Sequence, residues 1–245
     1  MWASVGFSLS TGGRAVEAGT GECENSRTMA TANHSAPRQC WHVVVPIKDT
    51  RLGKSRLAPA GVERTRLSRA IAEDTLAAVT QAVGPGQVWL VTSDEGLASR
   101  WLARGVHVVG DPGTGLNAAI AAGLDRVPLG SPRAVLLGDL PSLTGVDLVA
   151  ALDAGGDGAE WFVPDLDGSG TVLRAGRSFV PRFGPGSADA HAAQGARRLE
   201  LDLPRLRRDV DDPGSLAAAV QLGVGPATSA ALQLAGAERS SALDG

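Results

Sequence analysis

The sequence predicts a three-layer α/β fold with a mostly parallel β-sheet and helices on both faces. Short, wholly apolar, β-branched runs such as WHVVVPI and QVWLVT alternate with longer segments that have helical spacing of apolar residues. Strands buried on both faces appear as continuous apolar runs, and helices between them are the crossovers that parallel strands require. After residue 165 the long helices stop, which predicts an antiparallel addition to the sheet.

The first five predicted strands alternate strictly with four predicted helices. In the first helix, Leu67, Ile71 and Val79 recur at helical spacing, and a GPG triplet then breaks the pattern. The predicted strands cover 41–47, 87–92, 106–110, 133–139 and 160–165. The predicted helices cover 63–83, 94–105, 116–127 and 145–155. The sequence then predicts a turn and strand over 166–175, a glycine-rich loop into a short helix over 179–196, and a strand, an acidic turn and a closing helix over 197–223.

The 245 residues predict one domain, over 39–225. A disordered N-terminal extension is expected over 1–38, because this segment is rich in Gly, Ser, Thr and Ala and has no sustained periodicity. A frayed C-terminal tail is expected over 226–245.

Composition argues against several classes of function. The net charge is −3, so there is no basic footprint for nucleic acid, and no run of about 18 apolar residues could span a membrane. The N-terminal segment also lacks the charged start and long apolar core of a signal peptide. Only two cysteines occur, Cys23 and Cys40, which argues against a disulfide framework or a thiolate metal site and fits a reducing cytoplasm.

An aspartate stands where a predicted buried strand should leave the sheet. Asp139 follows the apolar run AVLLG, and in open α/β sheets ligands bind at the carboxyl ends of the strands. Thr92, Ser93 and Asp111 follow other strands in the same way. A carboxylate in this place can bind a hard cation such as Mg²⁺, or it can cap a local turn.

A second acidic cluster, RRDVDDPGSL, precedes the closing helix. Asp209 and Asp211 alternate, so in an extended segment both side chains project to one face. Asp212 stands before Pro213 and is the natural N-cap of the helix, which predicts a structural role. Together with Asp139, the first two carboxylates could bind one or two Mg²⁺ ions that bridge phosphates.

The basic counterpart is PIKDTRLGKSRL, the loop after the first strand. Lys48, Arg51, Lys54 and Arg56 lie close together in it. Its GKS triplet is not a P-loop, because Lys48 occupies the position where a P-loop requires its first glycine. A lysine-rich loop at the mouth of a parallel sheet suits a polyphosphate, and the alternative is a solvated surface turn.

Two glycine-rich stretches suit a phosphate group. FGPGSADAH places Ser187 at a helix start, where N–H groups and a hydroxyl can bind an anion, although Ser187 could also be an ordinary N-cap. DGSGTVL offers Thr171 after a glycine turn, which alone indicates only a hairpin. His191 is expected to be a plain helix residue, because no second histidine has metal-site spacing. The stretch GDPGTGLN lacks the G-x-G-x-x-G dinucleotide fingerprint.

Six motifs occur in the order expected of one family: VPIKDTRLGKSRL, DPGTGLNAAI, GDLPSL, DGSGTVL, FGPGSADAH and DVDDPGSL. Over 41–222 the chain resembles the phosphoenolpyruvate and 2-phospho-L-lactate guanylyltransferases of coenzyme F420 biosynthesis. The resemblance implies a nucleotidyltransferase-like, Rossmann-like fold. It also implies that GTP and a phosphorylated three-carbon acid give a guanosine diphosphate adduct and pyrophosphate, with Mg²⁺ as cofactor.

The same resemblance implies the site residues. Asp139 and Lys48 are the expected catalytic residues. The implied Mg²⁺ ligands are Asp139, Asp209 and Asp211, and the implied phosphoenolpyruvate-binding residues are Thr171, Gly184 and Ser187. The implied nucleotide-binding residues are Lys48, Lys54, Arg56, Ser93, Gly115, Leu116 and Asn117. Of these, the two lysines would face the triphosphate, and 115–117 would lie near the guanosine.

Two rival classes of function stay open at this point. One is another nucleotidyltransferase, such as a molybdenum-cofactor guanylyltransferase or a sugar-phosphate nucleotidyltransferase, and the absence of a G-G-x-G loop counts against both. The other is a non-catalytic nucleotide-binding regulator, which would be expected to lose some of the three acids. The acceptor could be phosphoenolpyruvate, 2-phospholactate or 3-phosphoglycerate. The expected partners are small molecules, neither nucleic acid nor membrane, and a homodimer is compatible with the sequence.

Overall fold

The apolar run after Trp41 forms β1 (His42–Ile47), a strand that is buried on both faces. Val43 and Val45 pack into a core on one face of the sheet, while Val44 packs into a second core on the other face. Because successive side chains of a strand point to opposite faces, an apolar run without alternation needs cover on both sides. The predicted three-layer arrangement is therefore confirmed at its central strand.

The computed structural model describes residues 40–51, 57 and 64–243. The predicted N-terminal extension and part of the basic loop lie outside these residues. The described residues all belong to one compact unit.

Within the described residues the strands form one seven-stranded sheet in the order β3-β2-β1-β4-β6-β5-β7. After β1 the strands are β2 (Val88–Thr92), β3 (His107–Gly110), β4 (Arg133–Leu136), β5 (Trp161–Pro164), β6 (Thr171–Gly176) and β7 (Arg197–Arg198). The first four strands pair parallel with one another, and β6 pairs antiparallel with both β4 and β5. The prediction of a mostly parallel sheet with an antiparallel addition is therefore confirmed.

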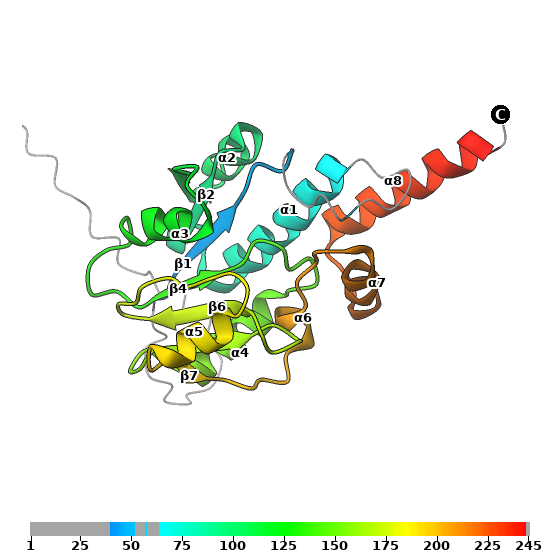
Figure 1. Cartoon of the computed structure of the whole chain (residues 1–245). Helices are drawn as coiled ribbons and strands as arrows, with labels where there is room; N and C mark the ends of the chain where they lie inside the picture. The colour runs from blue at the N-terminus through cyan, green and yellow to red at the C-terminus, as the bar shows by residue number, and fades with distance from the viewer. Residues whose placement is uncertain (1–39, 52–56, 58–63, 244–245) are drawn as a thin grey trace, which may run out of the picture. The chain divides into compact units, whose positions relative to one another are not determined.

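Helices cover both faces of this sheet (Figure 1). The helices are α1 (Arg64–Val83), the 3₁₀ turn η1 (Pro85–Gln87), α2 (Glu95–Leu102), α3 (Leu116–Leu124), α4 (Gly145–Gly155), α5 (Ser187–Ala193), α6 (Pro204–Arg207), α7 (Pro213–Leu222) and α8 (Pro226–Leu243). Side chains of α1 and α4 pack with Val43 and Val45, whereas Ala119 and Ile120 of α3 pack with Val44. None of the helices in the described part of the chain is long and apolar enough to cross a membrane.

Two predicted strands are shorter in the structure. The fourth ends at Leu136 instead of residue 139, and the one that begins at residue 197 is reduced to the two residues of β7. The earlier end of β4 places Gly138 and Asp139 in the segment that leaves the sheet. A Cβ atom at Gly138 would lie 2.5 Å from Ile47, so only glycine lets this segment pass so close to β1.

The predicted tail after residue 225 is wrong in one respect, because most of it forms α8. The first turn of this helix is capped by Asp74 of α1. The backbone N–H groups of Ala227 and Thr228 donate to the two carboxylate oxygens of Asp74 at 3.0 and 2.7 Å. Ala231 is buried in a cluster with Ile71 of α1. The partner that orders the segment lies far away in the sequence, and composition alone does not reveal it.

Cys40 is disulfide-bonded in the structure, which differs from the expectation of reduced cysteines.

Candidate active site

A cavity of about 500 Å³ lies at the carboxyl ends of the parallel strands β1 and β4. Ile47 and Lys48 at the end of β1 line it, together with the segment Leu137–Asp139 after β4. Further lining comes from Thr171 at the start of β6. Ligands of open α/β sheets bind at this edge, and the volume is typical of small-molecule sites. The cavity therefore lies where the sequence predicted a ligand.

The three predicted metal ligands meet in this cavity. Asp139, Asp209 and Asp211 all line it. The backbone N–H of Val210 donates to the carbonyl oxygen of Asp139 at 3.1 Å, which joins the exit of β4 to the acidic segment before α7. Burial, together with the charges of Asp139, Asp211 and Asp165, raises the pKa of Asp209 to about 7. The carboxylates are therefore close enough to repel one another.

A fourth acid of the cavity, Asp165, was not predicted. It follows β5 directly, and its Oδ1 atom is buried with no hydrogen-bond partner in the part of the chain that the structure describes. Its Oδ2 atom accepts from the N–H of Gly170 at 2.8 Å. A Cβ atom at Gly170 would collide with this carboxylate, so glycine is required there. Asp165 follows an apolar run of the sequence just as Asp139 does, so the sequence signal was available.

A divalent cation fits this donor set chemically. Carboxylate oxygens are the ligands that Mg²⁺ prefers, and a cation would offset the repulsion that raises the pKa of Asp209. Among the described residues, no three His, Cys, Asp or Glu side chains are arranged as a metal centre. The cluster supplies charge and donor atoms for a cation without a ready coordination geometry.

The three predicted acceptor-binding residues also come together. Thr171, Gly184 and Ser187 all line the cavity. Gly184 has a φ of 125°, a backbone conformation that residues with a side chain rarely adopt. Gly186, with a φ of 71°, occupies the N-cap of α5, so the alternative role of Ser187 as an N-cap is wrong. The hairpin that the sequence indicates at Thr171 is confirmed, because β5 and β6 form an antiparallel hairpin.

The loop that carries Gly184 is fastened by Asn117 of α3. Asn117 Nδ2 donates to the carbonyl oxygen of Phe183 at 2.9 Å, and the N–H of Phe183 donates to Asn117 Oδ1 at 2.8 Å. Asn117 is not among the described residues that line the cavity. The structure gives it the role of holding this loop, and its contact with guanosine stays a prediction.

The remaining predicted nucleotide-binding residues fall into three groups. Lys48 and Leu116 line the cavity. Ser93 and Gly115 are exposed and are not part of the lining found among the described residues. Lys54 and Arg56 lie outside the residues that the structure describes.

Ser68 of α1 is a second lining residue that was not predicted. Its side chain is buried, and its Oγ atom has no hydrogen-bond partner among the described residues. A buried hydroxyl without a partner is costly unless a ligand or water completes its hydrogen bonds. Ser68 lies within a helical apolar pattern, where nothing in the sequence distinguishes it from an ordinary helix residue.

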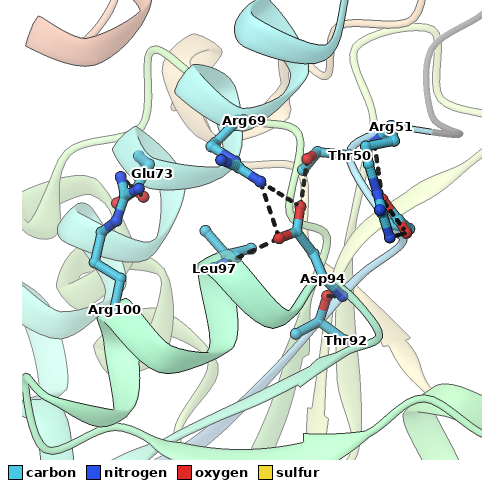
Figure 2. Close-up of polar contacts among 9 residues, drawn as sticks. Thr50, Arg51, Arg69, Glu73, Thr92, Asp94, Leu97 and Arg100 are labelled. Carbon is cyan, nitrogen blue, oxygen red and sulfur yellow. Dashed lines mark hydrogen bonds and ion pairs between the residues drawn. The ribbon is translucent and has the colours of Figure 1, made fainter.

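A buried carboxylate anchors the basic loop after β1. Asp94 accepts hydrogen bonds from the Thr50 hydroxyl, from Arg69 Nη2 at 3.0 Å and from the N–H of Leu97 at 3.0 Å (Figure 2). Burial by itself would raise the pKa of Asp94, but these hydrogen bonds hold it at about 2. Because Thr50 lines the cavity, this anchor fixes the loop that also carries Lys48.

Three other polar residues have structural partners. Arg51 is engaged by Asp49, with Nη2 donating to Oδ2 at 2.6 Å. Asp212 is the N-cap of α7 and accepts from the N–H of Ser215 at 2.7 Å, as predicted. His191 is a residue of α5, also as predicted.

Comparisons with solved structures and with known families identify the class to which this fold belongs. Residues 64–208 match the family of MobA-like NTP transferase domains. A candidate nucleotide-diphospho-sugar transferase from Desulfovibrio desulfuricans G20 superposes with a TM-score of 0.57 at 15% identity, covering 82% of this chain and 96% of that one. A nucleotidyl transferase from Methanothermobacter gives 0.51 at 18% identity, covering 75% and 97%. The fold, the domain match and the cavity define an enzyme of the nucleotidyltransferase class.

Sequence relatives narrow this class. The chain is 45% identical over 211 residues to a phosphoenolpyruvate guanylyltransferase of Thermomonospora curvata, covering 82% of this chain and 92% of the relative. It is 43% identical over 204 residues to one of Geodermatophilus obscurus, covering 79% and 94%. It is 40% identical over 200 residues to one of Streptomyces coelicolor, covering 78% and 94%. The chain belongs to the phosphoenolpyruvate guanylyltransferase family.

Proposed function

We propose that this enzyme transfers GMP from GTP to phosphoenolpyruvate, or to 2-phospho-L-lactate, with release of pyrophosphate, in coenzyme F420 biosynthesis. The observation that carries the proposal is that four carboxylates and Lys48 line the same cavity as Thr171, Gly184 and Ser187. The names of the relatives, phosphoenolpyruvate guanylyltransferases, support phosphoenolpyruvate as the acceptor. Substrates that are phosphorylated metabolites also agree with action in the cytoplasm, which we propose as its location.

The reaction needs positioning more than covalent help from the protein. A phosphate oxygen of the acceptor attacks the α-phosphorus of GTP in line and forms the new P–O bond. The bond from the α-phosphorus to the bridging oxygen breaks, and pyrophosphate leaves with the electron pair. A phosphate dianion is already an ionised nucleophile, so no side chain has to remove a proton. The tasks of the chain are therefore orientation and neutralisation of charge.

Residues on different sides of the cavity contribute to this orientation and charge neutralisation. Lys48 offers a positive charge to the triphosphate. The hydroxyl groups of Thr171 and Ser187 donate hydrogen bonds to anionic oxygens of the acceptor. The glycine backbone at Gly184 lets the acceptor approach the main chain closely.

We also propose that Asp139, Asp209 and Asp211 bind Mg²⁺. When bound, the cation supplies positive charge against the phosphate oxygens. The charge of the cavity supports this proposal, because Asp165 brings the acids to four and carboxylates alone would repel a triphosphate.

Pyrophosphate release is the direct test. The enzyme is incubated with GTP and Mg²⁺, with and without phosphoenolpyruvate, and parallel reactions replace the acceptor by 2-phospho-L-lactate or 3-phosphoglycerate and the donor by ATP, CTP or UTP. We expect release that requires GTP together with phosphoenolpyruvate or 2-phospho-L-lactate. Release without any acceptor, or only with another nucleotide or acceptor, would contradict the proposal.

The proposed acceptor-binding residues Thr171 and Ser187 lead to a separate prediction. Thr171→Val and Ser187→Ala each remove a hydrogen bond to a charged group, a loss of about 1.5–3 kcal/mol. We expect KM for phosphoenolpyruvate to rise about tenfold or more, at roughly tenfold per 1.4 kcal/mol, and KM for GTP to change much less. Ser99→Ala on the exposed side of α2 is the matched control. A larger rise in KM for GTP would mean that the two ligands lie the other way round.

A further inference from the structure

His191 is a polar ring that the proposed chemistry does not use. It has no exposed surface, and it packs between the rings of Phe162 and Phe183, with centroids 5.8 and 5.0 Å away. It is not among the described residues that line the cavity, but Thr171 is. His191 Nδ1 lies 3.0 Å from the hydroxyl oxygen of Thr171. The ring therefore stands directly behind one of the acceptor-binding hydroxyls.

The hydrogen bonds of His191 define its tautomer. The backbone N–H of Arg182 points at Nε2 from 3.3 Å. An amide N–H can only donate, so Nε2 accepts, and in a neutral imidazole the proton then resides on Nδ1. Burial, with a smaller effect from the charge of buried Arg174, lowers the pKa of His191 to about 4, which keeps the ring neutral at neutral pH. Nδ1 is therefore the donor in the contact with Thr171.

This donor determines where the Thr171 hydroxyl hydrogen can go. A hydroxyl has one hydrogen and two acceptor lone pairs. If Nδ1 were an acceptor, the hydroxyl would turn its hydrogen toward the ring and present lone pairs to the cavity, where they would repel an anion. With Nδ1–H donating, one lone pair is occupied and the hydrogen stays available to the cavity.

We propose that His191 is a positioning residue, which directs the Thr171 hydroxyl hydrogen toward an anionic oxygen of the acceptor. This deepens the proposed function and rests on it. The chemistry recognised is a phosphate or carboxylate oxygen that needs a hydrogen-bond donor. His191 itself does not touch the acceptor, so its effect passes through Thr171.

A double-mutant cycle tests this dependence. His191→Phe keeps an aromatic ring and removes both hydrogen bonds, whereas Thr171→Val removes the hydroxyl. We expect His191→Phe to raise KM for phosphoenolpyruvate about tenfold, the size expected for one hydrogen bond to a charged group, with KM for GTP nearly unchanged. In the Thr171→Val background the same change is expected to add nothing. An equal rise in both backgrounds, or no rise in either, overturns the proposal.

Two further variants separate positioning from packing. His191→Asn keeps an N–H close to the place of Nδ1–H, so it is expected to retain more affinity for phosphoenolpyruvate than His191→Phe does. Asp189→Asn, on the exposed side of α5, is the control and is expected to match the wild type. If His191→Asn is as impaired as His191→Phe while both melt at the same temperature as the wild type, the donor at Nδ1 has no role.

Nitrogen NMR of the imidazole rings does not depend on turnover. Among the four histidines of the chain, the His191 signals are assigned by their loss in His191→Phe. We expect a neutral ring protonated on Nδ1 at neutral pH, and a ring protonated on Nε2 overturns the inference even if phosphoenolpyruvate is a substrate. If the wild type does not use phosphoenolpyruvate, the proposed function fails, and the tautomer still decides whether the hydroxyl is directed into the cavity.

Discussion

Asp139→Asn is expected to abolish most turnover while the protein stays folded. The substitution keeps the shape of the side chain and removes its charge. If this carboxylate holds Mg²⁺, the enzyme loses several kcal/mol of transition-state stabilisation, at about 1.4 kcal/mol per tenfold in rate. We therefore expect kcat to fall about a hundredfold or more at saturating GTP and Mg²⁺. Turnover is measured as pyrophosphate release.

The thermal midpoint of the same variant, without nucleotide or metal, is expected to stay or to rise. One of the charges that raises the pKa of Asp209 is gone, so the like-charge repulsion in the apo protein is weaker. Asp212→Asn is the matched control, because it also neutralises an acid of this segment and Asn is an equally good N-cap. Near wild-type turnover in Asp139→Asn would rule out the metal role.

Asp94→Ala is expected to have the largest effect on stability. It removes the N-cap of α2, the partner of Arg69 and the acceptor for Thr50. The cap accounts for about 1 kcal/mol of the free energy of unfolding, and breaking a buried ion pair costs about 3–5 kcal/mol. Because the Arg69 side chain is 35% exposed, we expect a smaller total, about 3 kcal/mol. Denaturant unfolding of the wild type and the variant measures it.

Glu73→Ala is the control for this loss (Figure 2). Glu73 pairs with Arg100 at 2.6 Å and Arg104 at 3.3 Å, whose side chains are 44% and 52% exposed, so we expect a loss below about 1 kcal/mol. Equal losses in the two variants would contradict the anchoring role of Asp94.

Acid titration gives a second readout of the same anchor. The pKa of Asp94 is about 2 in the folded protein and 3.8 for an ordinary aspartate. A carboxylate with a lowered pKa contributes stability that is present above its unfolded pKa and is lost as the pH falls toward the folded one. The wild type should therefore lose this contribution between about pH 4 and pH 2, and Asp94→Ala should lack that part of the acid-induced loss.

The parts of the site that follow strands were predictable from the sequence. Asp139 follows an apolar run, and Asp209 and Asp211 alternate before a helix with an evident cap, so each carboxylate stood out from its neighbours. Asp165 carries the same signal as Asp139. The position of β6 between β4 and β5 was not predictable, because strand order depends on which edges pair and not on the local pattern.

Other features depend on partners far away in the chain. Asp74 caps α8 from α1, although more than 150 residues separate them. Ser68 contributes a hydroxyl to the cavity from within an apolar helical pattern. Asn117 forms a hydrogen bond with the backbone of Phe183, which lies 66 residues later in the sequence. In each case the local sequence predicts only an ordinary helix residue. The role of that residue depends on a tertiary contact.

Asn117 belongs to a helix that packs on β1 and β2, and Phe183 belongs to the loop between β6 and α5. The two hydrogen bonds between them join protein to protein, so the loop takes its shape without help from a ligand. If a phosphorylated acid binds there as proposed, it has little chain entropy left to remove, which favours a pre-organised fit. A pre-organised loop also adapts poorly to an acceptor of a different shape. The few atoms that distinguish one three-carbon acid from another would then alter affinity directly, and discrimination among acceptors would follow from rigidity as much as from the contacts themselves.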